Sequence, residues 1–212
     1  MTRQGKVRKD AGSEAEAIIS DVALAAAIKA YACTMRKAAK KARQITLPQP
    51  QILPFTTFEL TKDKVKNLAK KIQTGNRAED QDSEFLYLFR LSASNKVQIR
   101  IAMESFEAAR SYQGSPEYPG KKNLCRLNAS GSNKTLIYVG RSYSPRERFK
   151  QHLLSSEGGT YAIHFQQWAD KLKLQVDYVL YQLRGVDDEA VQVVEDGLWD
   201  YFTPMLGRRG DK

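Results

Sequence analysis

The sequence contains few of the residues that characterise secreted, membrane-spanning or metal-cluster proteins. Its 212 residues include two cysteines, Cys33 and Cys125, which stand far apart and have neither metal-ligand nor disulfide-framework spacing. No apolar run reaches the roughly 20 residues that a transmembrane helix needs, and no signal-peptide core follows the basic N-terminus. The cysteines are therefore expected to be reduced, and the protein to be cytoplasmic with no membrane partner.

Acidic residues are also in deficit. Lysine and arginine number 34 against 24 aspartates and glutamates, which gives a formal net charge of +10 and a pI near 9.5. Clustered cations gain affinity for a polyanion by releasing the counterions of its phosphates. The composition thus predicts nucleic acid as the partner.

The N-terminal part of the chain differs in composition from the rest. Residues 1–47 form a basic arm, in which residues 13–43 are rich in alanine and lack glycine and proline, a pattern that predicts one or two helices. Residues 48–82 are expected to connect this arm to the main domain. Three prolines within residues 47–54 disfavour a helix and predict a linker. A helix capped by its first residue is expected over residues 61–74.

Residues 83–212 are predicted to form the main domain, with an insertion at about residues 92–134. Three apolar runs, residues 85–91, 136–139 and 175–183, have the length and the β-branched and aromatic content of strands. The predicted fold class is α/β: a small, central, mainly antiparallel sheet of three strands that is flanked by helices, with the helical arm in front.

The insertion and the C-terminal part complete this prediction. Residues 96–103 alternate polar and apolar side chains, which indicates a half-buried strand after a hairpin turn at residues 92–95. Helices are expected over residues 161–172, in which His164 is interpreted as a packing residue, and over residues 187–202.

The most informative stretch comprises the second predicted strand and the helix start after it. Gly140 is expected to end this strand, and Ser144, Pro145 and Glu147 have the spacing of a helix start with a capping box. Four residues separate Arg148 from His152, so a helix presents both side chains on one face.

This stretch resembles the second motif of the GIY-YIG nuclease family. In that family a Tyr-(Ile/Val)-Gly strand end is followed, eight residues after the glycine, by an arginine and four residues later by a histidine or tyrosine. Tyr138, Gly140, Arg148 and His152 keep this spacing. The resemblance covers about residues 83–210 and implies a divalent-metal-dependent DNA endonuclease, of the restriction or defence type or from a phage or mobile element.

Glu195 lies at the edge of an apolar stripe on the last predicted helix, where a carboxylate is partly desolvated and needs a partner. The sequence leaves two partners open, an arginine of the sheet or a metal ion. The resemblance implies the metal, because the family keeps one glutamate on this helix as its only protein ligand to a catalytic Mg²⁺ or Mn²⁺ ion. Gly207 stands where the family often has an asparagine.

The resemblance also implies roles for the other residues. Arg148 would hold the scissile phosphate, with Tyr138 beside it. A further tyrosine would orient or deprotonate the attacking water, and His152 would take up the proton, since a phenol with a pKa near 10 is a poor base unaided. Two candidates remain for that first tyrosine position: Tyr87, in the first predicted strand, or Cys125, if residues 124–127 form the first strand and the tyrosine is lost.

Nine basic residues outside this set are predicted to contact DNA, although the basic face of the arm reads equally well as a solvated helix surface. A second copy of the chain, in a homodimer or higher oligomer, is a further candidate partner. Two other functions stay open: a nucleic-acid-binding protein that keeps the fold without cleavage, and a homing or repair nuclease. The nine residues are Arg141, Arg146, Lys150, Lys121, Lys122, Arg36, Lys37, Lys40 and Lys41.

Overall fold

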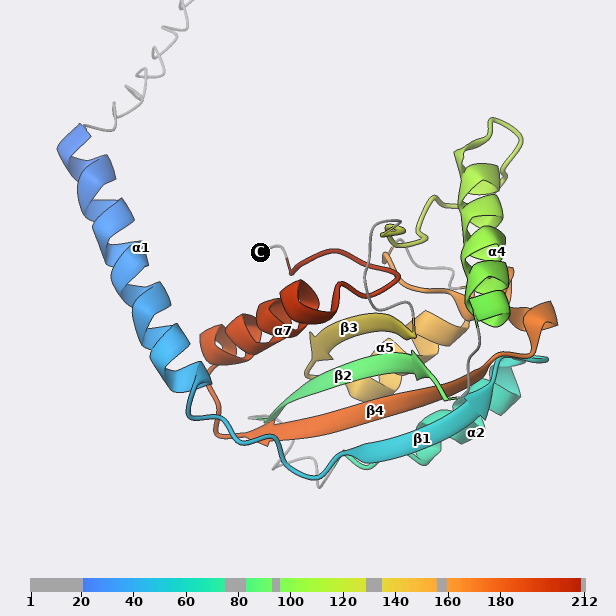
Figure 1. Ribbon diagram of the computed structural model, residues 1–212, viewed down its shortest axis with the longest axis horizontal. Coiled ribbons are helices and arrows are strands. Elements are labelled where there is room, and N and C mark those ends of the chain that lie inside the picture. The colour runs from blue at the N-terminus through green and yellow to red at the C-terminus, as the bar shows by residue number, and fades with distance from the viewer. Residues whose placement is uncertain (1–20, 75–82, 93–95, 129–134, 156–159, 211–212) are drawn as a thin grey trace, which may run out of the picture. The chain divides into compact units, whose positions relative to one another are not determined.

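The computed structural model describes residues 21–74, 83–92, 96–128, 135–155 and 160–210 (Figure 1). The chain forms two compact units, residues 1–37 and residues 38–212. Helix α1 (Asp21–Ala42) supplies the described part of the first unit and confirms the expected helix there, while residues 13–20 lie outside the described residues. No helix in the described part of the chain is long and apolar enough to cross a membrane.

The second unit is built on an antiparallel sheet of four strands. They are β1 (Gln51–Thr56), β2 (Ser83–Leu91), β3 (Leu136–Ser142) and β4 (Gln175–Arg184), in the order β1-β4-β2-β3. The α/β class and the antiparallel pairing are confirmed, whereas the prediction of three strands was wrong. The linker expected within residues 47–54 is partly strand β1, which accepts Pro54 because β1 lies at the edge of the sheet.

Helix α4 (Lys96–Gly114) replaces the strand predicted over residues 96–103. The alternation there was misleading, because Val97 and Ile101 are exposed while Ala102 and Phe106, four residues apart, are buried at helical spacing. The expected hairpin therefore has no second strand, and residues 93–95 of its turn lie outside the described residues.

Helices cover both faces of the sheet (Figure 1). On one face lie α2 (Lys62–Lys70), which Thr61 caps as expected, α5 (Pro145–Leu153) and the short α6 (Phe165–Trp168). The other face packs against α7 (Asp188–Phe202), which contacts β3 and β2 and has the bounds expected from sequence. The helix predicted over residues 161–172 is interrupted, with α6 followed by the 3-10 helix η1 (Asp170–Leu172).

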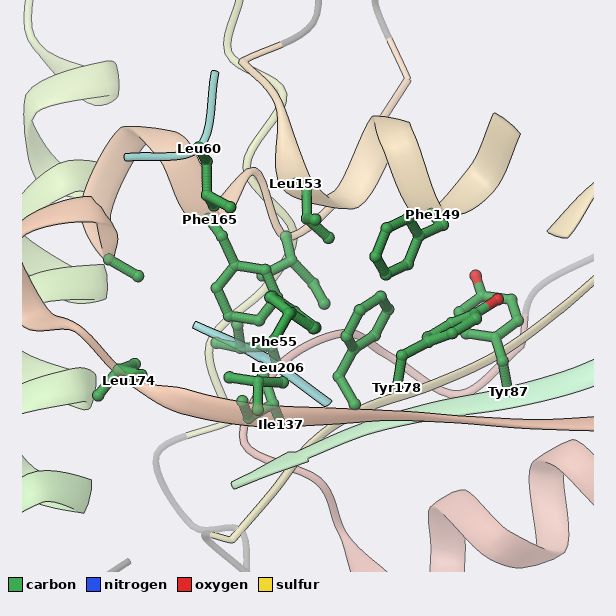
Figure 2. Close-up of a cluster of buried hydrophobic side chains, with 14 of the residues drawn as sticks. Phe55, Leu60, Tyr87, Ile137, Phe149, Leu153, Phe165, Leu174, Tyr178 and Leu206 are labelled. Carbon is green, nitrogen blue, oxygen red and sulfur yellow. The ribbon is translucent and has the colours of Figure 1, made fainter. Parts of the chain in front are cut away.

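The core on the α5 face is aromatic. Figure 2 shows Phe149 of α5 above Tyr178 of β4, with Phe55 and Phe165 further along the same cluster. Phe89 of β2 lies 4.9 Å from Tyr178 between ring centroids. The α7 face is covered by a separate aliphatic cluster, which consists of Leu86, Leu136, Val139, Leu183 and Val191. Tyr87 belongs to the aromatic cluster, and Tyr138 packs against it.

Candidate active site

Strands β2 and β3 bring two tyrosines together on the α5 face. Tyr87 lies opposite Gly140 and Phe89 opposite Tyr138 in the antiparallel pairing of these strands. The rings of Tyr87 and Tyr138 stack, with centroids 6.2 Å apart and planes at 15°. Strand β3 runs on to Ser142 rather than ending at Gly140. Glycine is needed at that position because a Cβ there would lie 2.6 Å from the Tyr87 hydroxyl oxygen.

Helix α5 supplies the other two residues of this group. It begins after Ser144 with Pro145 at its start, as expected, but Ser144 makes no side-chain capping bond, so the predicted capping box does not form. Phe149 is fully buried in the aromatic core. That burial fixes the helix so that Arg148 and His152 reach the strand tyrosines.

The Tyr87 hydroxyl is the centre of a hydrogen-bond network. Arg148 donates to it from Nε at 3.2 Å, and His152 Nε2 lies 3.0 Å from it. The same guanidinium donates from Nη1 to Gln151 Oε1 at 2.9 Å and from Nη2 to the Tyr161 carbonyl at 3.0 Å. Arg148 is therefore held in one orientation by three partners.

A backbone hydrogen bond determines the tautomer of His152 in this network. The Ile163 N–H donates to His152 Nδ1 at 3.1 Å, so this nitrogen carries no proton and the neutral ring is protonated at Nε2. His152 Nε2 consequently donates to the Tyr87 oxygen. The expectation that His152 takes up the tyrosine proton does not fit this geometry.

Burial sets the ionisation of these groups. It raises the pKa of Tyr87 well above its usual value and, reinforced by the Arg148 charge, holds the pKa of His152 well below its own. Burial also raises the pKa of Tyr138, with Arg148 acting in the opposite direction. For Arg148 itself, burial opposes the charge, but Tyr87 and Tyr138 outweigh it and raise its pKa. The resting group is a neutral histidine, two neutral tyrosines and one guanidinium.

Glu195 of α7 has the first of the two partners that the sequence left open. Arg141 of β3 places its Nε 3.4 Å from Glu195 Oε2, and its Nη1 pairs with Glu84 Oε1. Glu84 is buried, and its Oε2 has no hydrogen-bond partner among the described residues. Burial raises the pKa of Glu195 from 4.5 to about 7 although Arg141 opposes the shift, and burial also raises the pKa of Glu84.

This group also fits a cation. Two carboxylates share one guanidinium, and a carboxyl that burial leaves reluctant to ionise gains from any further positive charge. The described residues contain no cluster of three or more histidine, cysteine, aspartate or glutamate side chains that could hold a metal. A site at Glu195 would thus use one carboxylate, with water and substrate oxygens as the other ligands of a hard cation.

A cleft of about 500 Å³ joins the two groups. Tyr138, Arg148 and Glu195 all line it, while Tyr87 and His152, at 1% and 0% exposure, lie behind its wall. The cleft also carries four arginines: Arg110, Arg126, Arg208 and Arg209. Sequence reasoning assigned none of these four to the site. The only signal for them in the sequence was that Arg126, Arg208 and Arg209 occur in basic stretches.

The nine predicted DNA contacts are distributed elsewhere. Arg141 is engaged with the two glutamates, and Arg146 donates twice to the Ile72 carbonyl, at 2.9 and 2.8 Å. Lys150 pairs with Glu147, and Lys41 with Asp187. Within the described chain, none of the nine lines the cleft with Arg148. The remaining five are exposed on α1 or on the loop after α4: Arg36, Lys37, Lys40, Lys121 and Lys122.

The structure separates the two candidates for the first tyrosine position. Residues 124–127 form isolated bridges, Leu124 with Ala162 and Leu127 with Leu206, and β2 rather than this segment pairs with β3. Tyr87 therefore stacks on Tyr138 from the paired strand, whereas Cys125 lines the cleft together with Tyr138. Cys125 is buried, which raises its pKa to about 12 and keeps the thiol protonated.

Gly207 and His164 have structural explanations. Gly207 adopts φ +96°, and a Cβ there would lie 2.8 Å from the Tyr138 ring. Asn128 supplies an amide to this segment, donating to the carbonyls of Pro204 and Gly207 at 3.0 Å each. His164 is buried, with Nδ1 2.6 Å from the Leu154 carbonyl oxygen, which agrees with its interpretation as a packing residue.

No family model, curated protein or solved structure matches this chain. The function is therefore inferred from the geometry of the cleft. A fixed guanidinium and a carboxylate that favours a cation face one space, with a tyrosine beside them. This arrangement can bind an anion and a cation together.

Proposed function

We propose that the protein is a divalent-metal-dependent endonuclease of the GIY-YIG type, which hydrolyses phosphodiester bonds in DNA. The observation that supports this most strongly is that Tyr138 and Arg148 line one cleft together with Glu195, which is distant from both in sequence. The antiparallel sheet, with β2 paired to β3 and α5 and α7 on its two faces, is compatible with that fold. The net charge of +10 suits a polyanionic substrate.

Arg148 binds the scissile phosphate in this proposal. Its bonds to Tyr87, Gln151 and the Tyr161 carbonyl fix the guanidinium plane before substrate arrives. The N–H groups that these partners do not use can reach the phosphate oxygens and the Tyr138 hydroxyl. A guanidinium that is already oriented stabilises developing negative charge without further reorganisation.

Tyr87 positions the attacking water. Its oxygen already accepts from Arg148 and His152, so the hydroxyl has only its own proton left to donate, and a water that reaches it behind the cleft wall would accept that bond. Tyr87 would stay neutral and hold the water by this bond, and a non-bridging phosphate oxygen would take up the water proton as the new P–O bond forms and the bond to the leaving oxygen breaks. His152 acts by donating to and orienting Tyr87, and it stays neutral throughout.

Glu195 is the proposed metal ligand. A divalent ion held there would neutralise phosphate charge and make the attacking water more acidic. Arg141 keeps the carboxylate in place, since its guanidinium bridges Glu195 and the buried Glu84. The same ion pair also supports the second candidate function, a nucleic-acid-binding protein without cleavage, because Glu195 has a partner when no metal is bound.

Plasmid nicking separates the two functions. Supercoiled DNA incubated with the protein should be nicked in Mg²⁺ or Mn²⁺ and remain intact in EDTA. Glu195→Gln, which removes the charge at nearly constant shape, should abolish nicking and keep DNA binding; Glu189→Gln, an exposed glutamate of the same helix, should change neither. Nicking by Glu195→Gln at the wild-type rate would rule out the single-metal mechanism. Wild-type protein that binds but never nicks would favour the second function.

A further inference from the structure

Two of the arginines that line the cleft come from the chain segment of residues 96–128. Arg110 belongs to α4, and Arg126 follows that helix. Burial raises the pKa of Cys125, while Arg110 and Arg148 both oppose this shift, so both charges lie close to the same buried thiol. The segment that looked like an insertion thus carries cations to the position of the proposed phosphate ligand.

The helix that carries Arg110 is anchored to the aromatic core. Phe106, one turn before Arg110, is fully buried and meets the Trp168 ring edge to face, with centroids 5.2 Å apart. Ser105 Oγ donates to the Trp168 carbonyl at 2.7 Å. Residues four apart share a helix face, so the packing of Phe106 also fixes the direction in which Arg110 leaves the helix.

The backbone around Arg126 is held on both sides. The Cys125 N–H donates to the Ala162 carbonyl at 3.0 Å, and the Gly207 N–H donates to the Arg126 carbonyl at 2.7 Å. Leu127 bridges to Leu206 in the same antiparallel arrangement. The backbone at Arg126 is therefore held in place by hydrogen bonds, and the Arg126 side chain is exposed.

These two arginines differ from the other cations of the cleft. Arg209 lies near Asp196 and Asp200, at 3.8 and 3.2 Å, and Arg148 is committed to the tyrosine network. Arg110 and Arg126 form no ion pair or side-chain hydrogen bond with any residue in the described ranges. Guanidinium groups that have no acidic partner of their own attract an anion from solution, even though Glu195 lines the same cleft.

We propose that Arg110 and Arg126 bind the phosphates that flank the scissile one, so that the cleft takes a DNA strand with several consecutive phosphates rather than a lone phosphodiester. One phosphodiester carries a single charge, which the fork of Arg148 already matches. Further fixed guanidinium groups in the same cleft match the phosphates that precede and follow it. The inference depends on the proposed function for the identity of the central phosphate.

Salt-dependent binding tests it. The full chain carrying Glu195→Gln, which prevents cleavage, is titrated into a fluorescent DNA duplex at several salt concentrations. Adding Arg110→Gln and Arg126→Gln together should weaken binding at least about tenfold and lower the slope of log K against log salt by about 2, because each lost phosphate contact contributes about 0.9. Arg100→Gln is the matched control, since Arg100 lies on α4 outside the cleft and near Glu104.

A length series tests the claim of consecutive phosphates. The parent should bind an octanucleotide far more tightly than a dinucleotide with one phosphodiester, and the double variant should lose most of this advantage. An unchanged salt slope, or equal loss for both lengths, would overturn the inference. A changed slope in a protein whose wild type never nicks DNA would support the flanking-phosphate site and contradict only the nuclease function. Thermal melting shows that the double variant is folded.

Discussion

Near the cleft, the polar side chains on the two faces of the sheet differ in how completely they are paired. On the α5 face the Tyr87 hydroxyl receives two donors, and each of its partners is bonded in turn, through Ile163, Gln151 and Tyr161. On the α7 face Glu84 and Glu195 share Arg141, and Glu84 Oε2 lacks a partner among the described residues. The polar groups named on the α5 face all have partners, whereas on the α7 face two carboxylates share one guanidinium.

This difference separates two requirements of a catalytic site. Orientation is provided by the α5 face, where burial and hydrogen bonds fix Arg148 and Tyr87 before any ligand enters. In the proposed site, affinity for a cation would come from the α7 face, where burial makes the carboxylates costly to ionise alone. A site of this kind gives up some stability in the free protein in order to bind its ligands.

The largest effect is expected from breaking the complete network. Tyr87→Phe keeps the ring and removes the shared acceptor, so cleavage should fall by about a hundredfold or more. The variant also leaves the Arg148 Nε–H and His152 Nε2–H without their acceptor, which should lower the free energy of unfolding by about 1–3 kcal/mol. Cleavage assays and thermal melts measure the two effects.

Tyr178→Phe is the matched control for this substitution. Tyr178 belongs to the same aromatic cluster, 5.7 Å from Tyr87 between ring centroids, and its buried hydroxyl has no partner among the described residues. Removing that hydroxyl should leave cleavage unchanged and stability equal or higher. Equal loss of activity in both variants would show that the aromatic cluster matters only as packing.

A smaller effect, on the free energy of unfolding, is expected from removing the Glu195 charge on the α7 face. The folded protein holds the pKa of Glu195 near 7 instead of 4.5, so the stability contributed by its proton is fully present below about pH 4.5 and is lost as the pH rises through 7. In EDTA, Glu195→Gln should be more stable than wild type at pH 8 by about 3 kcal/mol, and the gain should vanish near pH 4.5.

Glu195→Gln can be compared directly with the wild type because Arg141 still has Glu84 as an ion-pair partner in the variant. Melting curves from pH 4.5 to 8 measure the difference, with Glu189→Gln as the exposed control on the same helix. A gain that does not depend on pH would mean that the carboxyl is not destabilised by its burial.

The smallest effect concerns Arg146, which was predicted to contact DNA. Its guanidinium donates twice to the Ile72 carbonyl, beyond the end of α2, and so joins α5 to that segment. Arg146→Gln should lower the free energy of unfolding by about 1 kcal/mol and leave the DNA affinity and its salt slope nearly unchanged. A loss of affinity without a loss of stability would restore Arg146 as a DNA contact.

Local spacing predicted the α5 side of the site well. Tyr138, Gly140, Arg148 and His152 lie within fifteen residues of one another, so a strand, a turn and a helix suffice to bring them together. Tyr87 was one of two candidates for the position beside them, and only the pairing of β2 with β3 puts its ring against Tyr138. The partner of Glu195 was visible only as a choice between an arginine and a metal.

The remaining parts of the site depend on contacts that no local pattern contains. Residues 96–103 alternate like a strand, yet the burial of Ala102 and of Phe106, which packs on Trp168, makes them part of a helix. The position of Arg110 depends on that helix. The tautomer of His152 depends on the Ile163 backbone, and Arg126 on pairing with residues 205–207. Strand β1 forms in spite of Pro54 because β4 offers it an edge to pair with.

The central position of β2 has a consequence for the synthesis of the protein. Tyr87 pairs on one side with Gly140 and on the other with Leu180, both of which are made much later. At about 5–20 residues per second, roughly 5–20 s pass between translation of Tyr87 and of Leu180. During that interval the backbone N–H and C=O groups of the aromatic segment 85–89 lack the strands that pair with them on both sides. Such a segment can pair with other nascent chains. Chaperone capture during translation is therefore expected to decide how much active protein a cell obtains.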